Sequence, residues 1–221
     1  MLHAPKQSRS RKTLERILSA ARSLMASEGV DEVGITQIVA EAKSSVGSFY
    51  ARFDGKEDLI RHLHERLWDE AGARWRQGMD TWSGEGTPES RVEGLVDLIR
   101  GSVEPDYGLR ASLGRVLGQD GTDARQEFDA QVVRDGSRLF DGDAAIRHPS
   151  PSEGISVGVR LSLSALRDQL GSRGLNGGTE DGFDLAAELV TVLRGYWGVG
   201  KVVQAAGPTD DTAIEYFDIW G

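Results

Sequence analysis

The sequence contains no cysteine, so it offers neither a disulfide framework nor thiolate ligands for a metal ion. No apolar run approaches the roughly 18 residues that a membrane span requires. The basic start of the chain also lacks the apolar segment of a signal peptide. The sequence therefore predicts a cytoplasmic protein that makes no contact with membranes and binds no metal.

Motifs of catalysis and of cofactor binding are also scarce. Neither a P-loop nor a G-x-G-x-x-G motif is present. Residues 154–158 match the G-x-S-x-G of hydrolases around Ser156, but that motif needs a preceding strand and a later histidine, and the last histidine is His148. His62 and His64 are two positions apart on a predicted helix and point in different directions, which disfavours a metal pair. We expect no catalytic residues, no cofactor and no enzyme activity.

Charge is distributed unevenly along the chain. Residues 1–60 have a net charge of +1, whereas the remaining residues carry −10. The first 27 residues contain six basic side chains and a single acid, Glu15. We expect residues 1–10 to be disordered in the free protein and to screen phosphates on a nucleic acid. The acidic remainder should repel DNA and confine its contact to one end of the molecule.

Three short helices are predicted near the start of the chain. The first, residues 13–26, has apolar side chains at helical spacing and ends at Glu28-Gly29. Thr36 is predicted to cap the second helix, which continues to residue 42. The third occupies residues 45–53. The second and third helices together predict a helix-turn-helix, in which the latter helix reads DNA.

The third helix has one apolar face and one small, polar face. Ser45 is predicted to cap it, and Val46, Phe49 and Phe53 share one stripe at i, i+3 and i+7. The residues left facing outward are small or hydroxyl-bearing, namely Gly47, Ser48, Tyr50 and Ala51. Such a face suits a helix that enters a major groove about 12 Å wide.

Residues 11–67 resemble the DNA-binding domain of TetR-family transcriptional regulators. The resemblance rests on Met25-Ala26-Ser27-Glu28-Gly29, Ile35-Thr36, Ala42, Ser45-x-Gly47-x-Phe49-Tyr50-x-x-Phe53 and Lys56-Glu57-x-Leu59. It implies an all-α fold in which a helix-turn-helix domain, residues 1–55, is joined by a long helix to a helical effector-binding and dimerisation domain, residues 56–221. The partners it implies are double-stranded DNA with a pseudo-palindromic operator, a second copy of the chain and a small-molecule effector.

The resemblance also implies a set of DNA contacts. Phosphates would be bound by Thr36, Ser45, Tyr50 and Lys56, and base edges by Ser44, Val46, Gly47 and Ser48. Val46 has the alternative of being a core residue. These contacts would fix the register of the protein on DNA and read part of the sequence.

The turn before the third helix departs from the family pattern, which commonly has a glycine and then an aliphatic residue where this chain has Lys43-Ser44. A positive φ at Lys43 would cost about 1 kcal/mol, which a phosphate contact could offset. Ser44 either loosens the packing between the two helices or faces the groove, and both alternatives stay open.

Helices are predicted at residues 56–82, 88–103, 106–119, 122–140, 151–170 and 180–205, with loops at 141–151 and 171–182. On the first of these, Leu59, Ile60, Leu63 and Leu67 face the reading head. A second stripe of Trp68, Trp75, Met79 and Trp82 is either core or pocket lining. The predicted effector pocket consists of that stripe with Leu113 and Phe128.

Small residues are spaced along one face of the helix at 151–170, namely Gly154, Gly158 and Ser162. Such a row allows close packing either between two subunits or within one subunit. The predicted dimer interface comprises this row together with Leu189, Tyr196 and Trp197.

The sequence thus predicts a homodimeric, ligand-responsive transcriptional regulator that represses until an effector releases it from DNA. An activator of the same fold is one alternative. A small-molecule-binding or hydrolytic helical protein without DNA binding is the other.

Overall fold

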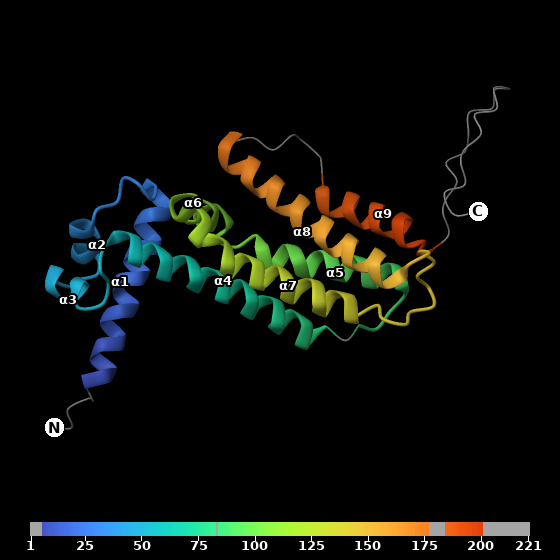
Figure 1. Ribbon diagram of the computed structural model, residues 1–221, viewed down its shortest axis with the longest axis horizontal. Coiled ribbons are helices and arrows are strands. Elements are labelled where there is room, and N and C mark those ends of the chain that lie inside the picture. Colours follow the sequence, from blue (N-terminus) through green and yellow to red (C-terminus); the bar gives the residue numbers. More distant parts are fainter. Residues whose placement is uncertain (1–5, 83, 177–183, 201–221) are drawn as a thin grey trace.

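The computed structural model describes residues 6–82, 84–176 and 184–200. Within these ranges the chain forms helices and no strand. The helices are α1 (Lys6–Glu28), α2 (Ile35–Glu41), α3 (Val46–Tyr50), α4 (Lys56–Thr81), α5 (Pro88–Val103), α6 (Tyr107–Leu117), the short 3-10 helix η1 (Gly118–Gly121), α7 (Thr122–Arg138), α8 (Pro151–Asn176) and α9 (Leu185–Trp197). Figure 1 shows α1 to α3 gathered at one end of an elongated molecule, with α4 running from them into a bundle.

The buried apolar side chains form two cores. The N-terminal core joins α1, α2, α3 and the first half of α4 with three leucines of α6, Leu109, Leu113 and Leu117. The C-terminal core joins the second half of α4 with α5, α7, α8 and α9. Helix α6 is distant in sequence from α1 but packs against it, so the reading head rests on a helix of the bundle.

Helix α4 contributes to both cores, as its two predicted stripes require. Leu59 and Leu63 lie in the N-terminal core, whereas Trp68 and Trp75 lie in the C-terminal core. Because a helix turns by about 100° per residue, successive stripes along one long helix face different neighbours. A displacement of α4 therefore affects both ends of the molecule.

The bounds of the later helices follow the predictions with four exceptions, the first of which is α6, which ends at Leu117 and not at residue 119. Helix α5 begins at Pro88, as predicted, and the Thr87 side chain accepts a hydrogen bond from the Ser90 N–H at 3.3 Å. The predicted end of α8 at residue 170 is wrong, because the helix continues to Asn176. Helix α7 ends two residues early, and α9 ends at Trp197 because Gly198 adopts a left-handed φ of 66°. The expected start and end of this last helix lie outside the described residues.

Candidate nucleic-acid interface and ligand pocket

The turn between α2 and α3 contains one residue in the left-handed conformation, which is costly for any residue other than glycine. Lys43 has a φ of 47°. Its N–H donates to the Ala40 carbonyl oxygen at 3.0 Å, and the Ser44 N–H donates to that of Val39 at 2.9 Å. These two bonds satisfy carbonyls at the end of α2. The Lys43 side chain is exposed beside α3.

Ser45 caps α3, as predicted. Its Oγ accepts a hydrogen bond from the Ser48 N–H at 3.1 Å, and its hydroxyl donates to the Ser48 Oγ at 3.0 Å. The helix ends at Tyr50, before the predicted residue 53. The buried ring of Phe49, on its inner face, lies 5.3 Å from the buried ring of Phe53, which follows the helix. The cap and these two anchors fix α3, although it has only five residues.

The outer face of α3 is open to solvent. Tyr50 is 56% exposed, and Gly47 has no atom within 4 Å of the position that a Cβ would occupy. Val46 is 44% exposed, so its predicted place in the buried stripe is wrong. It is the first residue of the helix, and helical side chains tilt toward the N-terminus, which directs this one past the edge of the core. The alternative interpretation, in which Val46 faces the DNA, remains available.

Two other predicted DNA contacts have unexpected surroundings. Thr36 does not cap α2, because the helix begins at Ile35 and the capping position belongs to Gly34. Thr36 is nevertheless exposed in the first turn of the helix. Lys56, at the start of α4, donates through Nζ to the Asp31 carbonyl oxygen at 3.0 Å. An ammonium group has three donors, so two stay available.

The structure favours the first of the two alternatives for Ser44, which is looser packing between α2 and α3. Its Oγ is buried and has no hydrogen-bond partner among the described residues. A buried hydroxyl without a partner costs about 1–3 kcal/mol. The side chain therefore weakens the packing between α2 and α3 and does not face outward.

Arg52 is a structural residue of this region that sequence reasoning missed. Its Nη1 donates to the Ser48 carbonyl oxygen at 2.6 Å, and its Nη2 donates to the Ser10 Oγ at 3.1 Å. The side chain therefore joins the end of α3 to the start of α1. Only the tertiary fold brings these segments together, because 42 residues separate Arg52 from Ser10.

A second group of charged side chains ties α1 to the bundle. Arg22 of α1 pairs with Asp106, just before α6, at 2.5 Å and with Glu70 of α4 at 3.1 Å. Arg66 of α4 pairs with Glu15 of α1 at 2.7 Å and with Glu70 at 3.3 Å. The orientation of α1 therefore depends on both α4 and α6.

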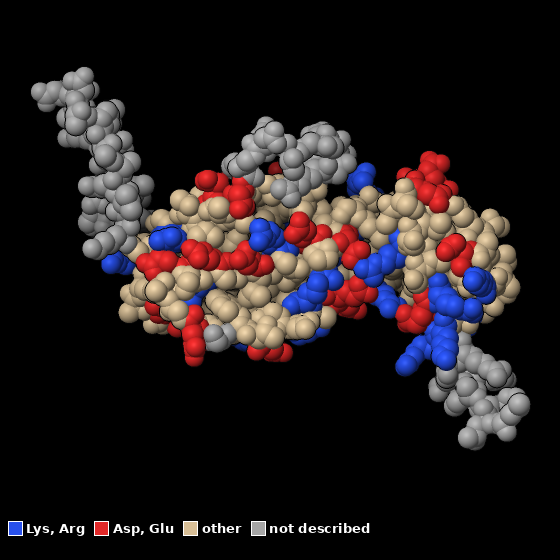
Figure 2. Space-filling view, turned by 180° about the vertical axis from the view of Figure 1, so that it is seen from behind, with Lys and Arg blue, Asp and Glu red and all other residues tan. Residues whose placement is uncertain are grey.

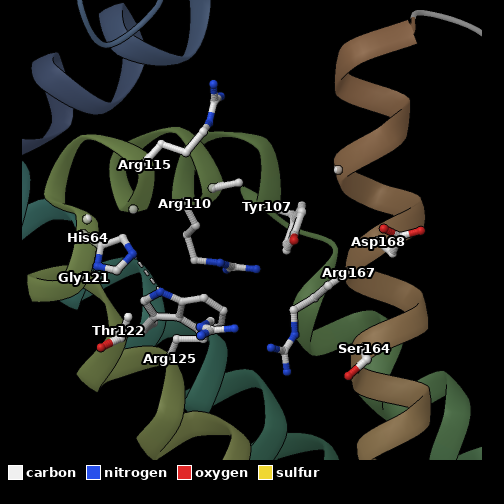
Figure 3. A pocket seen from close by; sticks show the side chains of 15 residues that line it. His64, Tyr107, Arg110, Arg115, Gly121, Thr122, Arg125, Ser164, Arg167 and Asp168 are labelled. Atoms are coloured by element: carbon white, nitrogen blue, oxygen red, sulfur yellow. Dashed lines mark hydrogen bonds between the residues drawn. The ribbon is translucent and has the colours of Figure 1, made fainter.

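A cavity of about 630 Å³ lies between α4, α6, α7 and α8 (Figure 3). Its lining includes His64 and Trp68 of α4, Tyr107 and Arg110 of α6, and Arg167 of α8. The Trp68 Nε1–H donates to the His64 Nε2 at 3.0 Å. Burial and the nearby Arg110 charge lower the pKa of His64, so the ring is neutral at neutral pH.

The predicted pocket residues are distributed over several places. Trp68 lines the cavity. Phe128 packs against Trp68, and Trp75 and Met79 belong to the C-terminal core. The placement of the other two is different: Trp82 lines a separate hollow between α4 and α5, and Leu113 points into the N-terminal core. The tryptophan stripe is thus mainly core, because Trp75 donates a hydrogen bond to Asp135 of α7 and Trp82 packs against Gly94 of α5.

The predicted row of small residues packs within the chain. A Cβ on Gly158 would lie 2.7 Å from atoms of Leu193 and Trp197. The Trp197 Nε1–H donates to the Gly154 carbonyl oxygen at 2.9 Å, and the Ser162 hydroxyl donates to that of Gly158 at 2.9 Å. The row therefore seats α9 on α8, and the prediction that it forms a dimer interface is wrong.

The rest of the predicted interface is also largely internal. Leu189 and Trp197 are buried in the C-terminal core, and half-buried Tyr196 contacts the His148 ring. The small residues are buried between α8 and α9 because they allow the two helices to pack closely. The large apolar side chains that α8 and α9 leave exposed are different ones, namely Val157, Leu161 and Val192.

The segment around Ser156 is helical, whereas the hydrolase motif needs a strand before its serine. It lies inside α8, and the Ser156 Oγ shares a hydrogen bond with the Ser137 Oγ at 3.2 Å. Among the described residues, no group of three or more potential ligands is arranged to hold a metal ion. None of the described helices has the length and apolar character needed to cross a bilayer.

Comparison with known proteins agrees with this geometry. Residues 17–63 match the family described as bacterial regulatory proteins, tetR family. No curated protein matches the chain. The fold resembles that of Salmonella enterica GusR, with a TM-score of 0.57, 21% identity, and coverage of 84% of this chain and 95% of the other.

Two further structures share the fold. A bacterial regulatory protein in the tetR family from Rhodococcus RHA1 has a TM-score of 0.61 and 17% identity, and the match covers 86% of this chain and 98% of that one. The transcriptional regulator FadR from Bacillus subtilis, in complex with stearoyl-CoA, has a TM-score of 0.54 and 16% identity, with coverage of 85% and 99%.

An exposed recognition helix, capped by Ser45 and presented at one end of a molecule whose described elements are all helices, is typical of DNA-binding transcriptional regulators. The family match over residues 17–63 and the shared fold specify it further. Residues 17–63 therefore form a DNA-binding domain of the tetR family of bacterial regulatory proteins, and the chain has the fold of the regulators named above.

Proposed function

We propose that this chain is a homodimeric repressor that a small-molecule effector releases from a pseudo-palindromic operator. In this proposal residues 1–55 read the operator, and residues 56–221 bind the effector and the second subunit. The observation that carries the proposal is the exposed outer face of α3, on which Gly47 and Tyr50 are free to approach DNA.

The distribution of charge supports contact at this end. Figure 2 shows Lys and Arg side chains gathered near the start of the chain and rows of Asp and Glu along the bundle. The negative bundle would repel a duplex and orient the positive end toward it. Salt should weaken such binding, because each neutralised phosphate releases counterions.

The position of α6 supports effector control. Leu109, Leu113 and Leu117 of this helix pack in the N-terminal core, while Tyr107 and Arg110 line the cavity. A ligand in the cavity would therefore contact a helix whose other face carries the reading head. To shift an equilibrium from 1:99 to 99:1, the ligand must prefer the released arrangement by about 5.5 kcal/mol.

A mobility-shift assay on the DNA upstream of the coding region tests operator binding. We expect Tyr50→Phe to weaken binding about tenfold, because a hydroxyl that donates to a phosphate is lost. The double variant Tyr50→Phe, Lys56→Ala should weaken it further and reduce the salt dependence by about one phosphate. Tyr196→Phe, in the bundle, is the matched control. Unchanged binding by the double variant would overturn the proposed phosphate contacts.

A promoter–reporter fusion tests the direction of regulation. Expression of the wild-type chain should lower reporter output, and the double variant should restore it. Higher output with the wild-type chain would instead identify an activator of the same fold.

A further inference from the structure

The lining of the cavity contains many positive charges. Four arginines, Arg110, Arg115, Arg125 and Arg167, line it, together with a single acid, Asp168. Figure 3 shows the guanidinium groups of Arg110, Arg125 and Arg167 pointing into the same space, whereas that of Arg115 points away. Three helices supply the converging groups, so no local sequence motif reveals the cluster.

Arg110 is the most deeply placed of these cations. It is 1% exposed, and its guanidinium lies over the Trp68 ring with 4.7 Å from Cζ to the ring centroid. It donates to the carbonyl oxygens of Val103 and Leu67, but its Nε is buried without a partner. Burial lowers its pKa to about 10, so it remains cationic at neutral pH.

The other two cations differ in how they are neutralised. Arg167 forms a bidentate ion pair with Asp129, with N–O distances of 2.5 and 2.9 Å. Neither Arg110 nor Arg125 forms an ion pair with any described residue, and Arg125 is exposed at the cavity edge. Two arginines that form no ion pair among the described residues therefore face one cavity, beside a third that is already paired.

A buried cation without a counter-ion is costly, and a bound anion would offset that cost. A guanidinium binds carboxylate or phosphate oxygens through two parallel N–H donors. The Tyr107 side chain points toward the same space in Figure 3 and offers a hydroxyl donor. The volume exceeds that of an inorganic ion and lies in the range of pockets for small organic ligands.

We infer that the cavity binds an organic anion whose carboxylate or phosphate group is held between Arg110 and Arg125. This inference rests on the proposed effector control, because it names the chemical class of the effector. Trp68 and the glycines of α6 and η1 then surround the remainder of the ligand.

Isothermal titration calorimetry on the full chain tests the inference with three matched probes: 2-naphthoate, 2-naphthyl phosphate and the neutral 2-naphthamide. We expect the anions to bind at least tenfold more tightly than the amide. Arg125→Gln should weaken the anions about tenfold and leave the amide unchanged. Arg115→Gln removes the same charge from the same lining but from a side chain that points away, so it should alter neither. The exposed position of Arg125 makes this variant safer for folding than any change at Arg110.

The preference between the two anions distinguishes an acid from a phosphate ester, and either result supports the inference. Equal binding of the amide, equal losses from Arg115→Gln and Arg125→Gln, or no binding of either anion at millimolar concentration overturns it.

A mobility-shift assay with the same probes separates this inference from the proposed function. Anion binding that leaves the DNA complex intact would support the anion site and overturn effector control. Release of DNA by the amide alone would do the reverse.

Discussion

Two residues of the helix-turn-helix, Lys43 and Ser44, carry a local free-energy cost. Lys43 has a positive φ, which glycine adopts without strain, and the Ser44 hydroxyl is buried without a partner. Both lie at the turn that sets the angle between α2 and α3. In the proposed complex, a phosphate that paired with the exposed Lys43 ammonium would offset this strain.

His64 links the cavity to the stability of the fold. Its neutral ring accepts the Trp68 N–H, and burial together with the Arg110 charge lowers its pKa below the ordinary value of about 6.5. In the unfolded chain the ring titrates near that ordinary value. Below about pH 6.5 the unfolded state therefore binds more protons than the folded state, and the free energy of unfolding decreases as the pH falls.

We predict that His64→Gln reduces this loss of stability between about pH 7.5 and pH 5. Glutamine cannot take up a proton, and its carbonyl oxygen can accept the Trp68 hydrogen bond. Urea unfolding at a series of pH values measures the slope. His62→Gln, on the exposed side of the same helix, should retain the His64 contribution. An equal slope for wild type and His64→Gln would contradict the prediction.

Among the contacts between helices, that of α8 with α9 depends on Gly158, which has no side chain. Gly158 allows the Trp197 ring and Leu193 to approach α8, and a Cβ would meet both at 2.7 Å. The ring is rigid and buried, so it has little room to move.

We predict that Gly158→Ala lowers the free energy of unfolding by about 1–3 kcal/mol, because the added methyl group overpacks this contact. Gly101→Ala is the matched control: Gly101 lies in α5 with no atom near its missing Cβ. It should raise stability by about 0.5–1 kcal/mol, since alanine loses less backbone freedom in a helix. Thermal and urea unfolding measure both. Equal effects of the two changes would exclude tight packing at Gly158.

At the scale of the whole molecule, the proposed dimer requires a face that the single chain leaves uncovered. Val157 and Leu161 are one turn apart on α8, and Val192 lies on the adjacent α9; each is 45–50% exposed. These three residues form what we name the α8–α9 face. A second copy that covers it would bring two recognition helices into one molecule, as half-sites about 34–36 Å apart require.

We predict that Leu161→Glu with Val192→Glu converts a dimer into a monomer of 24.0 kDa, because a charge cannot be buried in an apolar contact without a partner. Light scattering after gel filtration measures the mass. Val116→Glu changes a similarly exposed valine on α6 (42%) and should leave the dimer intact. A wild-type monomer, or a dimer that survives both changes on the α8–α9 face, would contradict the proposal. Loss of the dimer should also weaken operator binding.

The features that depend on local pattern could be predicted from the sequence. Apolar spacing predicted the helices and the packing of α4 in two cores. The Ser45 cap with Phe49 and Phe53 predicted the contacts that position α3. Capping and amphipathic spacing act over a few residues, so they can be read along the chain.

Which helix faces pack against each other became clear from the folded chain alone. The fold placed Leu113 in the N-terminal core, turned Gly158 toward α9, and brought Arg110 and Arg125 to one cavity. An apolar or small residue can pack equally well against several neighbours, and a cluster of charges from separate helices leaves no spacing in the sequence. Those choices depend on how all the helices fill one volume, which is a property of the folded chain.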